Sequence, residues 1–245
     1  MMAYFEAATA PEGSAGTVAV LLFPGVVPLD AVGPYQMLVA LRRSGYRVVT
    51  VAKEAGIVES DGPLALRADA SFESVGPVDV LVVPGGAHGT MDAAPGTATT
   101  AFVRAVYDAG ATVASVCTGA WLLAGAGVIG PGDTAATPWG GDVVLERYGV
   151  AASDERVHRA GRVWTAGGVS SGIDLGLALV AELGGAELAE RTRLVNQYAA
   201  HPDPAAATPA GSGHPVAPGV ERLVDLVYRS MASRATSAAG RDADD

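Results

Sequence analysis

The sequence has almost no cysteine, since Cys117 is the only one among 245 residues. A single cysteine cannot form an internal disulfide, so disulfide cross-links play no part in holding this chain together. The N-terminal residues include Glu6 and Glu12 but no early basic residue, and they therefore do not resemble a secretory signal. Both observations predict a cytoplasmic protein.

Long hydrophobic runs and basic patches are missing too. No uninterrupted apolar stretch reaches the roughly 18 residues that a membrane-spanning helix needs, which argues against a membrane partner. The 16 basic residues are scattered and outnumbered by 26 acidic residues, which gives a formal net charge of −10. Because this charge repels phosphate backbones, we do not expect nucleic acid as a partner.

Metal and nucleotide motifs are also absent. The four histidines, His88, His158, His201 and His214, show no metal-ligand spacing, so no metal site is predicted. The glycine-rich stretch 124–132 follows a predicted helix instead of preceding one, so it is not a phosphate-binding fingerprint. The sequence therefore offers no motif for a bound cofactor.

What the sequence does contain is enough apolar material for one α/β domain. Hydrophobic residues make up 49% of the chain and charged residues 17%, which is typical of a folded globular protein. We expect a flexible lead over 1–16, a single domain over 17–232 and a flexible tail over 233–245.

Predicted strands alternate with predicted helices along this domain. Apolar stretches rich in β-branched residues predict buried strands, and periodic apolar patterns predict helices. The alternation is typical of a doubly wound, mainly parallel sheet, in which ligands bind beyond the carboxyl ends of the strands. The predicted strands are 17–23, 46–52, 78–86 and 111–116, with a hairpin over 55–69 and a strand pair over 157–168; the predicted helices are 33–44, 97–109, 171–183, 185–198 and 219–232.

Cys117 follows the strand 111–116 directly and precedes a predicted helix. Its neighbours Ser115 and Gly119 are small, as in the strained strand-to-helix turn called a nucleophile elbow. A helix N-terminus favours the thiolate, which is the nucleophilic form of cysteine. The alternative is that Cys117 is a small buried hydrophobic residue, which is the common fate of a free cysteine.

Two other loops are predicted to reach the same edge of the sheet. The stretch "FPGVVPLDAVGPYQ" places Asp30 after the first strand, either as an acid/base group or as a helix N-cap ahead of Pro34. The stretch "VPGGAHG" contains Gly85 and Gly86, whose N–H groups either face an anion or simply form a turn. Three strand ends that converge on one edge form a candidate pocket.

Other polar and aromatic residues are assigned structural roles. His88 in the glycine loop is interpreted as a solvent-facing residue, and Asp174 as a capping partner of Ser171 at a helix start. Trp121 and Trp139 are interpreted as core or pocket-wall residues.

Five segments appear in order along the chain between about 17 and 204: "FPGVVPLDAVGPYQ", "VLVVPGG", "SVCTGAWLLAGAGVI", "WTAGGVSSGIDLGLALV" and "NQYAAHPDP". Together they resemble the ThiJ/PfpI superfamily and, within it, the isocyanide hydratase branch. The resemblance implies a flavodoxin-like three-layer sandwich, a homodimer and no metal or organic cofactor. It further implies Cys117 as the nucleophile, Asp30 as its acidic neighbour, Thr118 beside it, and Gly86 with its neighbour Gly85 as backbone donors near the reacting atom.

Two positions depart from the patterns of this superfamily. Members described as proteases or amidases usually carry histidine directly after the cysteine, where this chain has Thr118. Members of the branch commonly read Thr-Thr-His-Trp downstream, where this chain has Ala136, Thr137, Pro138 and Trp139. Because proline neither accepts nor donates a proton, hydrolysis by a Cys–His pair is poorly supported.

The first functional hypothesis, which the resemblance implies, is hydration of an isocyanide as the small-molecule substrate. The Cys117 thiolate would attack the terminal carbon, and water would resolve the resulting thioimidate to an N-substituted formamide while Asp30 relays protons. One alternative is other thiol chemistry, either glyoxalase-like hydration of an α-oxoaldehyde or amide hydrolysis. Another is a non-enzymatic redox-sensing or ligand-binding module. The roughly 40 residues after Pro204 are too few for an added DNA-binding domain.

Overall fold

Seven strands form the central sheet in the order β10 (Val157–Ala160), β11 (Val163–Ala166), β7 (Thr112–Val116), β6 (Val80–Val83), β1 (Gly16–Leu21), β2 (Tyr46–Ala52) and β5 (Ala70–Ser71). All neighbouring pairs are parallel except β10 and β11, which are antiparallel. These coordinates are a computed structural model that describes residues 14–86, 90, 96–199, 222, 224–226, 228 and 229. The mainly parallel sheet confirms the predicted α/β fold class.

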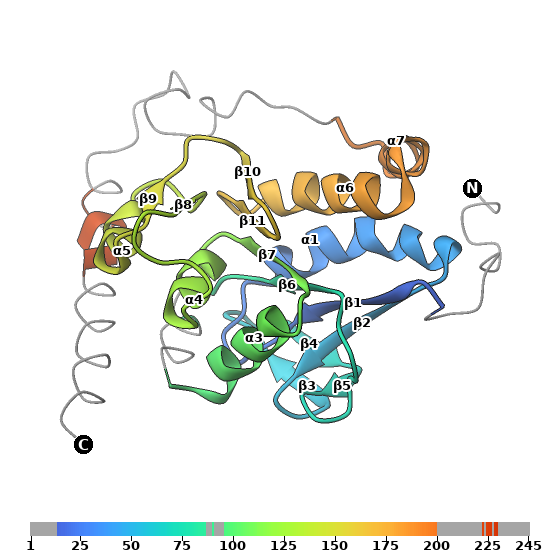
Figure 1. Cartoon of the computed structure of the whole chain (residues 1–245), viewed down its shortest axis with the longest axis horizontal. Helices are drawn as coiled ribbons and strands as arrows, with labels where there is room; N and C mark the ends of the chain where they lie inside the picture. The colour runs from blue at the N-terminus through green and yellow to red at the C-terminus, as the bar shows by residue number, and fades with distance from the viewer. Residues whose placement is uncertain are drawn as a thin grey trace.

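Helices cover both faces of this sheet and produce three layers (Figure 1). On one face α1 packs against α6, and α6 packs against α7; on the other face α3 packs against α4. The helices are α1 (Pro28–Leu38), α3 (Ala98–Asp108), α4 (Gly119–Gly125), α5 (Asp142–Leu145), α6 (Ser171–Gly184) and α7 (Ala186–Val195), with 3₁₀ turns η2 (Val39–Ser44) and η3 (Glu146–Tyr148). Two small sheets are added, β3 (Gly56–Glu59) with β4 (Ala65–Ala68) and β8 (Thr134–Ala135) with β9 (Ala151–Ala152).

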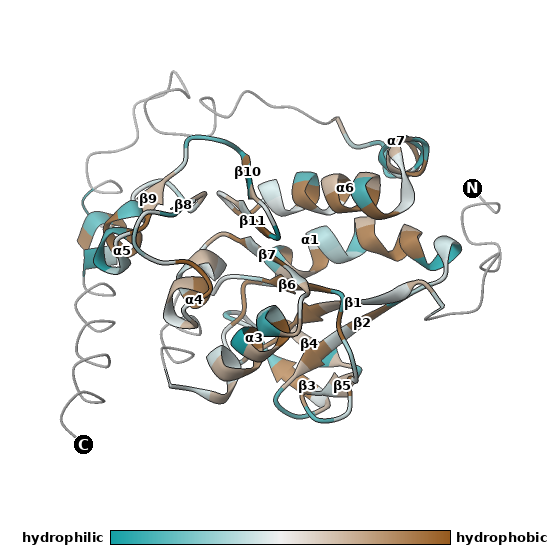
Figure 2. Ribbon diagram, viewed as in Figure 1, coloured by the Kyte–Doolittle hydropathy of each residue, from teal (hydrophilic) through white to brown (hydrophobic). Residues whose placement is uncertain are grey.

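The central strands are apolar along their whole length because both of their faces are covered. Val18, Val20 and Leu21 in β1 have no exposed surface, and all four residues of β6 are buried. Figure 2 shows the same feature as brown colour along the strands between the helix layers. A strand that is covered on both sides appears in the sequence as a continuous hydrophobic run and not as an alternating pattern. For this reason the positions of these strands could be predicted from the sequence.

Helix α1 differs from its prediction. It begins at Pro28 and not at Gly33, so Pro28 takes the first-turn position and Pro34 lies inside the helix. Pro34 lies where α1 meets α6. The two helices approach so closely there that an added Cβ at Gly176 would lie 3.0 Å from the Cα atom of Pro34. The earlier start places Asp30 in the first turn of α1, where the sequence had indicated a loop.

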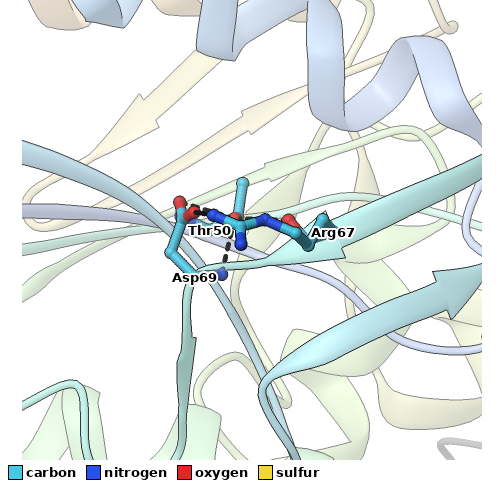
Figure 3. Close-up of polar contacts among 3 residues, drawn as sticks. All are labelled: Thr50, Arg67 and Asp69. Carbon is cyan, nitrogen blue, oxygen red and sulfur yellow. Dashed lines mark hydrogen bonds and ion pairs between the residues drawn. The ribbon is translucent and has the colours of Figure 1, made fainter.

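A polar cluster joins the predicted hairpin, which the structure shows as β3 and β4, to strand β2 of the main sheet (Figure 3). The Thr50 hydroxyl of β2 donates to the backbone oxygen of Arg67 at 2.8 Å and to Oδ2 of Asp69 at 2.9 Å. The Asp69 N–H in turn donates to the Thr50 backbone oxygen at 2.9 Å. These bonds fix the hairpin on β2.

The remaining elements agree with the sequence in part. The antiparallel pair β10 and β11 confirms the strand pair predicted over 157–168, and residues 222, 224–226, 228 and 229 are helical, within the helix predicted over 219–232. The limits of the lead, domain and tail stay predictions. Among the helices that the structure describes, none combines the length and the apolar character needed to cross a bilayer.

Candidate active site

Cys117 lies in a strained turn between β7 and α4. Its φ angle is 59°, in the left-handed region that non-glycine residues seldom adopt, and its N–H donates to the Ala166 carbonyl at 3.0 Å. An added side chain at Gly119 would collide with the Val83 carbonyl oxygen, so only glycine lets α4 start this close to β6. The predicted nucleophile elbow is confirmed as backbone geometry.

Asp30 is the acidic neighbour of Cys117 and has no exposed surface. Its Oδ2 atom accepts a hydrogen bond from the Gly85 N–H at 3.0 Å. Its Oδ1 atom has no hydrogen-bond partner among the described residues. One carboxyl oxygen is thus fixed by the β6 loop, while the other accepts no hydrogen bond of this kind within the described ranges.

In the Cys117–Asp30 pair, ionisation of both groups at once is unfavourable. Burial raises the pKa of Asp30 to about 7, and Asp61 adds to this rise, whereas the Gly85 N–H and the Cys117 thiol act in the opposite direction. Burial also raises the pKa of the Cys117 thiol, and the Asp30 carboxylate raises it further. At neutral pH the two groups therefore hold at least one proton between them.

The sequence predicted that the start of α4 would favour the Cys117 thiolate. The Thr118 N–H and hydroxyl do lower the pKa of the thiol, but burial and the Asp30 charge outweigh them. The prediction of a low thiol pKa is therefore wrong. The hydrogen bonds from Thr118 lower this pKa by less than the loss of hydration and the nearby carboxylate raise it.

The loop after β6 and the turn after β7 are held together by hydrogen bonds. The residues involved are Gly86 and Thr118, with Gly85 packed closely against them. The Gly86 N–H donates to the Thr118 hydroxyl at 3.0 Å, and this hydroxyl also lies 2.9 Å from that of Thr90. A Cβ at Gly85 would lie 2.9 Å from Oδ2 of Asp30 and 2.7 Å from the Thr118 nitrogen, so this position needs glycine. Because both glycine N–H groups already have acceptors, their predicted role as donors to a substrate stays a prediction.

A cavity of about 670 Å³ opens next to Cys117. Its aromatic walls are Trp139 and Tyr228, and Pro138 also lines it. The charged residues that line it are Asp142, Asp154, Glu155 and Arg156. Cys117 is only 8% exposed, but the little surface it has faces this cavity, so it is not simply a core residue.

Tyr228 is the site residue that sequence reasoning missed. Its ring packs edge-on against Trp121, with ring centroids 5.3 Å apart and an interplanar angle of 89°. Burial raises the pKa of Tyr228 to about 12, and the nearby ionisable groups Cys117 and Asp30 contribute to the rise. The C-terminal helix was predicted, but no local signal in the sequence indicates that it packs beside residues more than 100 positions earlier.

Asp174 does not cap α6 as predicted. Its carboxylate accepts hydrogen bonds from Arg156 and from the Tyr198 hydroxyl, while the Ser171 hydroxyl donates to the Gly168 carbonyl. Arg156 is therefore already paired where it lines the cavity, and it also lines a second cavity of about 630 Å³ that does not include Cys117. The pattern Ser-x-x-Asp was compatible with a cap, but the long-range ion pair was not visible locally.

The histidines add nothing to the site within the described residues. His158 lies on β10, where its Nδ1 atom is 2.6 Å from Glu155 Oε2, and it does not line the cavity next to Cys117. His88, His201 and His214 fall outside the described residues. In the part of the chain that the structure describes, no three side chains of the metal-ligating types come together.

The fold and the elbow define a flavodoxin-like α/β protein with a cysteine and a buried carboxyl group at the carboxyl edge of its sheet. The family model that matches residues 16–182 is that of the DJ-1/PfpI family. The chain belongs to this family, which confirms the resemblance noted in the sequence.

Individual relatives agree with this assignment. The chain is 36% identical over 195 residues to the isonitrile hydratase of Pseudomonas putida, covering 80% of this chain and 81% of that protein. A THiJ/PfpI family protein from Pseudomonas syringae superposes with a TM-score of 0.77 and 31% identity, covering 94% of this chain and 92% of that one. Oxidized DJ-1 of Toxoplasma gondii shares the fold, with a TM-score of 0.64 and 24% identity over 75% of this chain and 98% of that one.

Proposed function

We propose that this protein is a cysteine-dependent hydratase that converts an isocyanide to an N-substituted formamide. The observation that carries the proposal is the Cys117–Asp30 pair, in which a buried carboxyl group keeps one oxygen without a partner among the described residues, beside a thiol that faces a cavity. The similarity to an isonitrile hydratase, isonitrile being another word for isocyanide, supports the same substrate class.

In the first step the Cys117 sulfur forms a bond to the terminal carbon of the isocyanide. The proton held by the Cys117–Asp30 pair moves to the same carbon, which gives a neutral thioimidate, R–N=CH–S–Cys117. The free Oδ1 atom of Asp30 supports this transfer, because it can accept the thiol proton and pass it on. No additional acid or base is required for this step.

In the second step a water molecule adds to the thioimidate carbon. The water oxygen becomes the formamide oxygen, one of its protons goes to the substrate nitrogen, and the carbon–sulfur bond breaks. The other proton returns to the Cys117–Asp30 pair, so that the sum is isocyanide plus water giving formamide. Asp30 acts as acid and base in turn, and Pro138 takes no part in the proton transfers.

Thr118, Gly85 and Gly86 are proposed to position this pair. The Gly85 N–H orients the Asp30 carboxyl, and the Thr118 hydroxyl anchors the β6 loop through Gly86. A role of Thr118 or the glycine N–H groups in contacting the substrate would require these bonds to rearrange during the reaction. We further propose a cytoplasmic homodimer that acts without a metal or organic cofactor, which light scattering and metal analysis of the purified protein would test.

The test is formation of formamide from cyclohexyl isocyanide, followed by NMR. The wild-type chain should produce N-cyclohexylformamide, Cys117→Ala should produce none above the uncatalysed background, and Asp30→Asn should lose about 10²- to 10⁴-fold in kcat. Equal rates for wild type and Cys117→Ala would contradict the mechanism. Methylglyoxal offered to the same samples separates hydration of isocyanides from glyoxalase-like chemistry, since consumption of methylglyoxal alone would favour the latter.

A further inference from the structure

Tyr228 reaches the candidate active site from the C-terminal helix, far from the elbow in sequence. We propose that Tyr228 is a specificity-determining residue whose ring forms the cavity wall that limits the size of the group that can reach Cys117. The substrate class in this proposal rests on the proposed function, but the limit on access to Cys117 does not.

The first support is that the ring of Tyr228 is held in place. It packs edge-on against Trp121, which is only 4% exposed, at a centroid distance of 5.3 Å. The indole N–H of Trp121 donates to the Thr137 hydroxyl at 3.0 Å, which fixes the indole ring itself. A ring that leans on a fixed and buried partner forms a wall of defined position.

The second support is that the chain makes room for the C-terminal helix at Gly140. An added Cβ at this residue would lie 3.2 Å from Cγ1 of Val224 and 3.5 Å from Cδ2 of Tyr228. The φ angle of Gly140 is 78°, a conformation that also favours glycine. Gly140 lines the same cavity as Cys117 and Tyr228, so the close approach occurs at the cavity itself.

The third support is the chemical state of the phenol. Burial, together with the nearby ionisable groups Cys117 and Asp30, raises the pKa of Tyr228 to about 12, so the hydroxyl stays neutral at physiological pH. A neutral phenol adds no further negative charge beside the Cys117–Asp30 pair. Tyr228 therefore shapes the cavity without competing with Asp30 for the catalytic proton.

Tyr228 also lies outside the segment that the family match covers. That match ends at residue 182, whereas the wall is contributed by residue 228. The elbow and its carboxyl partner fall within the matched segment. The proposed size limit therefore does not follow from the family match itself.

The direct test is the rate at which Cys117 is alkylated, because it is the only cysteine in the chain and labelling reports on it alone. A small reagent, iodoacetamide, is compared with a bulky one, N-(1-pyrenyl)maleimide. Tyr228→Ala should increase the rate with the bulky reagent about tenfold or more relative to the rate with iodoacetamide. Tyr228→Phe keeps the ring and should leave this ratio unchanged.

Two further variants complete the test. Leu226→Ala removes an apolar side chain from the same segment, but one that is 67% exposed, and should leave the ratio unchanged. Tyr228→Trp enlarges the wall and should slow the bulky reagent selectively, which keeps the proposal testable even where Tyr228→Ala fails to fold. Circular dichroism verifies the fold of each variant.

The proposal is overturned if folded Tyr228→Ala accelerates both reagents equally or neither, or if Tyr228→Phe behaves as Tyr228→Ala does. With an active enzyme, the ratio of kcat/KM for 2-naphthyl isocyanide to that for cyclohexyl isocyanide should rise in Tyr228→Ala, and an unchanged ratio counts against the proposal. If no isocyanide is hydrated, the proposed function fails, while the alkylation experiment still decides the role of Tyr228.

Discussion

Asp30 has no exposed surface, yet one of its carboxyl oxygens lacks a hydrogen-bond partner among the described residues. Buried polar atoms are nearly always paired, because an unpaired one costs free energy. In Asp30 this cost coincides with the position next to Cys117, where an unpaired oxygen can receive a proton. The same unpaired, buried oxygen of Asp30 therefore accounts for both the unfavourable burial and the proposed proton transfer.

The pH dependence of the reaction follows from this pair. The form that carries a single proton is active, and below the pKa of Asp30, which is about 7, both groups are protonated. We therefore expect log kcat/KM to rise with pH, level off near pH 7 and stay level until the raised pKa of the thiol is approached.

A control for this profile is Asp61→Asn, because the charge of Asp61 raises the pKa of Asp30 and its side chain is exposed. In this variant the rising limb should move to lower pH, and added salt should abolish the difference from wild type. A profile that is flat between pH 5 and 9 would exclude Asp30 as the proton-carrying group.

Asp30 should also lower stability. Its pKa rises from 3.8 to about 7 on folding, which corresponds to a cost of about 4 kcal/mol once both states are ionised. The sign follows from the raised pKa: the cost is absent below the unfolded pKa, grows as the pH rises, and is complete above about 7. Asp30→Asn removes the charge but leaves a buried amide, so we expect it to recover about 1–2 kcal/mol at pH 8 and almost nothing at pH 3.5.

Urea unfolding at the two pH values measures this effect. Cys117→Ala serves as the comparison, since it removes the thiol but leaves the carboxyl in place. Equal stability of wild type and Asp30→Asn at pH 8 would show that Asp30 is not penalised by burial as the geometry indicates.

The contact of α1 with α6 is the element-scale feature that positions Asp30. An added Cβ at Gly176 would lie 3.0 Å from the Cα and carbonyl oxygen of Pro34, which are backbone atoms that cannot move without moving α1. Alanine would gain up to about 1 kcal/mol in helix propensity but lose about 1–3 kcal/mol through overpacking. We expect Gly176→Ala to be destabilising by about 1–2 kcal/mol and to lower kcat as well, because α1 carries Asp30.

The matched control for this variant is Gly130→Ala, since an added Cβ at Gly130 meets no atom within 4 Å. Thermal unfolding and formamide production are measured for both variants. A Gly176→Ala protein with wild-type stability and activity would show that α1 and α6 can separate without disturbing the site.

At the scale of the whole molecule, charge should influence which substrates enter. The chain carries a net charge of −10, and the cavity beside Cys117 is lined by Asp142, Asp154 and Glu155. Arg156, the one basic residue among the lining residues, is already paired with Asp174. We expect kcat/KM for isocyanoacetate to be about tenfold below that for its methyl ester, a difference that shrinks at high salt.

Asp154→Asn should reduce this preference, whereas Asp108→Asn, which changes an exposed residue on α3, should affect it less. Rates for both substrates at low and at high ionic strength provide the measurement. If the anion and the ester react equally well at low salt, the acidic lining does not control entry.

Prediction from sequence succeeded where the feature depends on a local pattern and failed where it depends on contacts between distant residues. Strands β1, β2 and β7 were located because a buried parallel strand reads as an apolar run, and Cys117 was found because small residues flank it at the end of such a run. The start of α1 was missed because two prolines, Pro28 and Pro34, each suit a first turn and local pattern does not choose between them. Asp174 was misread because a capping pattern and a distant ion pair require the same residue.

The sequence by itself determined the order of strands and helices along the chain, the position of the elbow, and the placement of Asp30, Gly85 and Thr118 at one edge of the sheet. These properties depend on hydrophobic pattern and on chain direction. Only the tertiary structure decided the protonation of Cys117 and Asp30 and the presence of Tyr228 at the cavity. Burial and long-range contact fix those properties, because the free energy of a charge depends on everything that surrounds it and not on its neighbours in the chain.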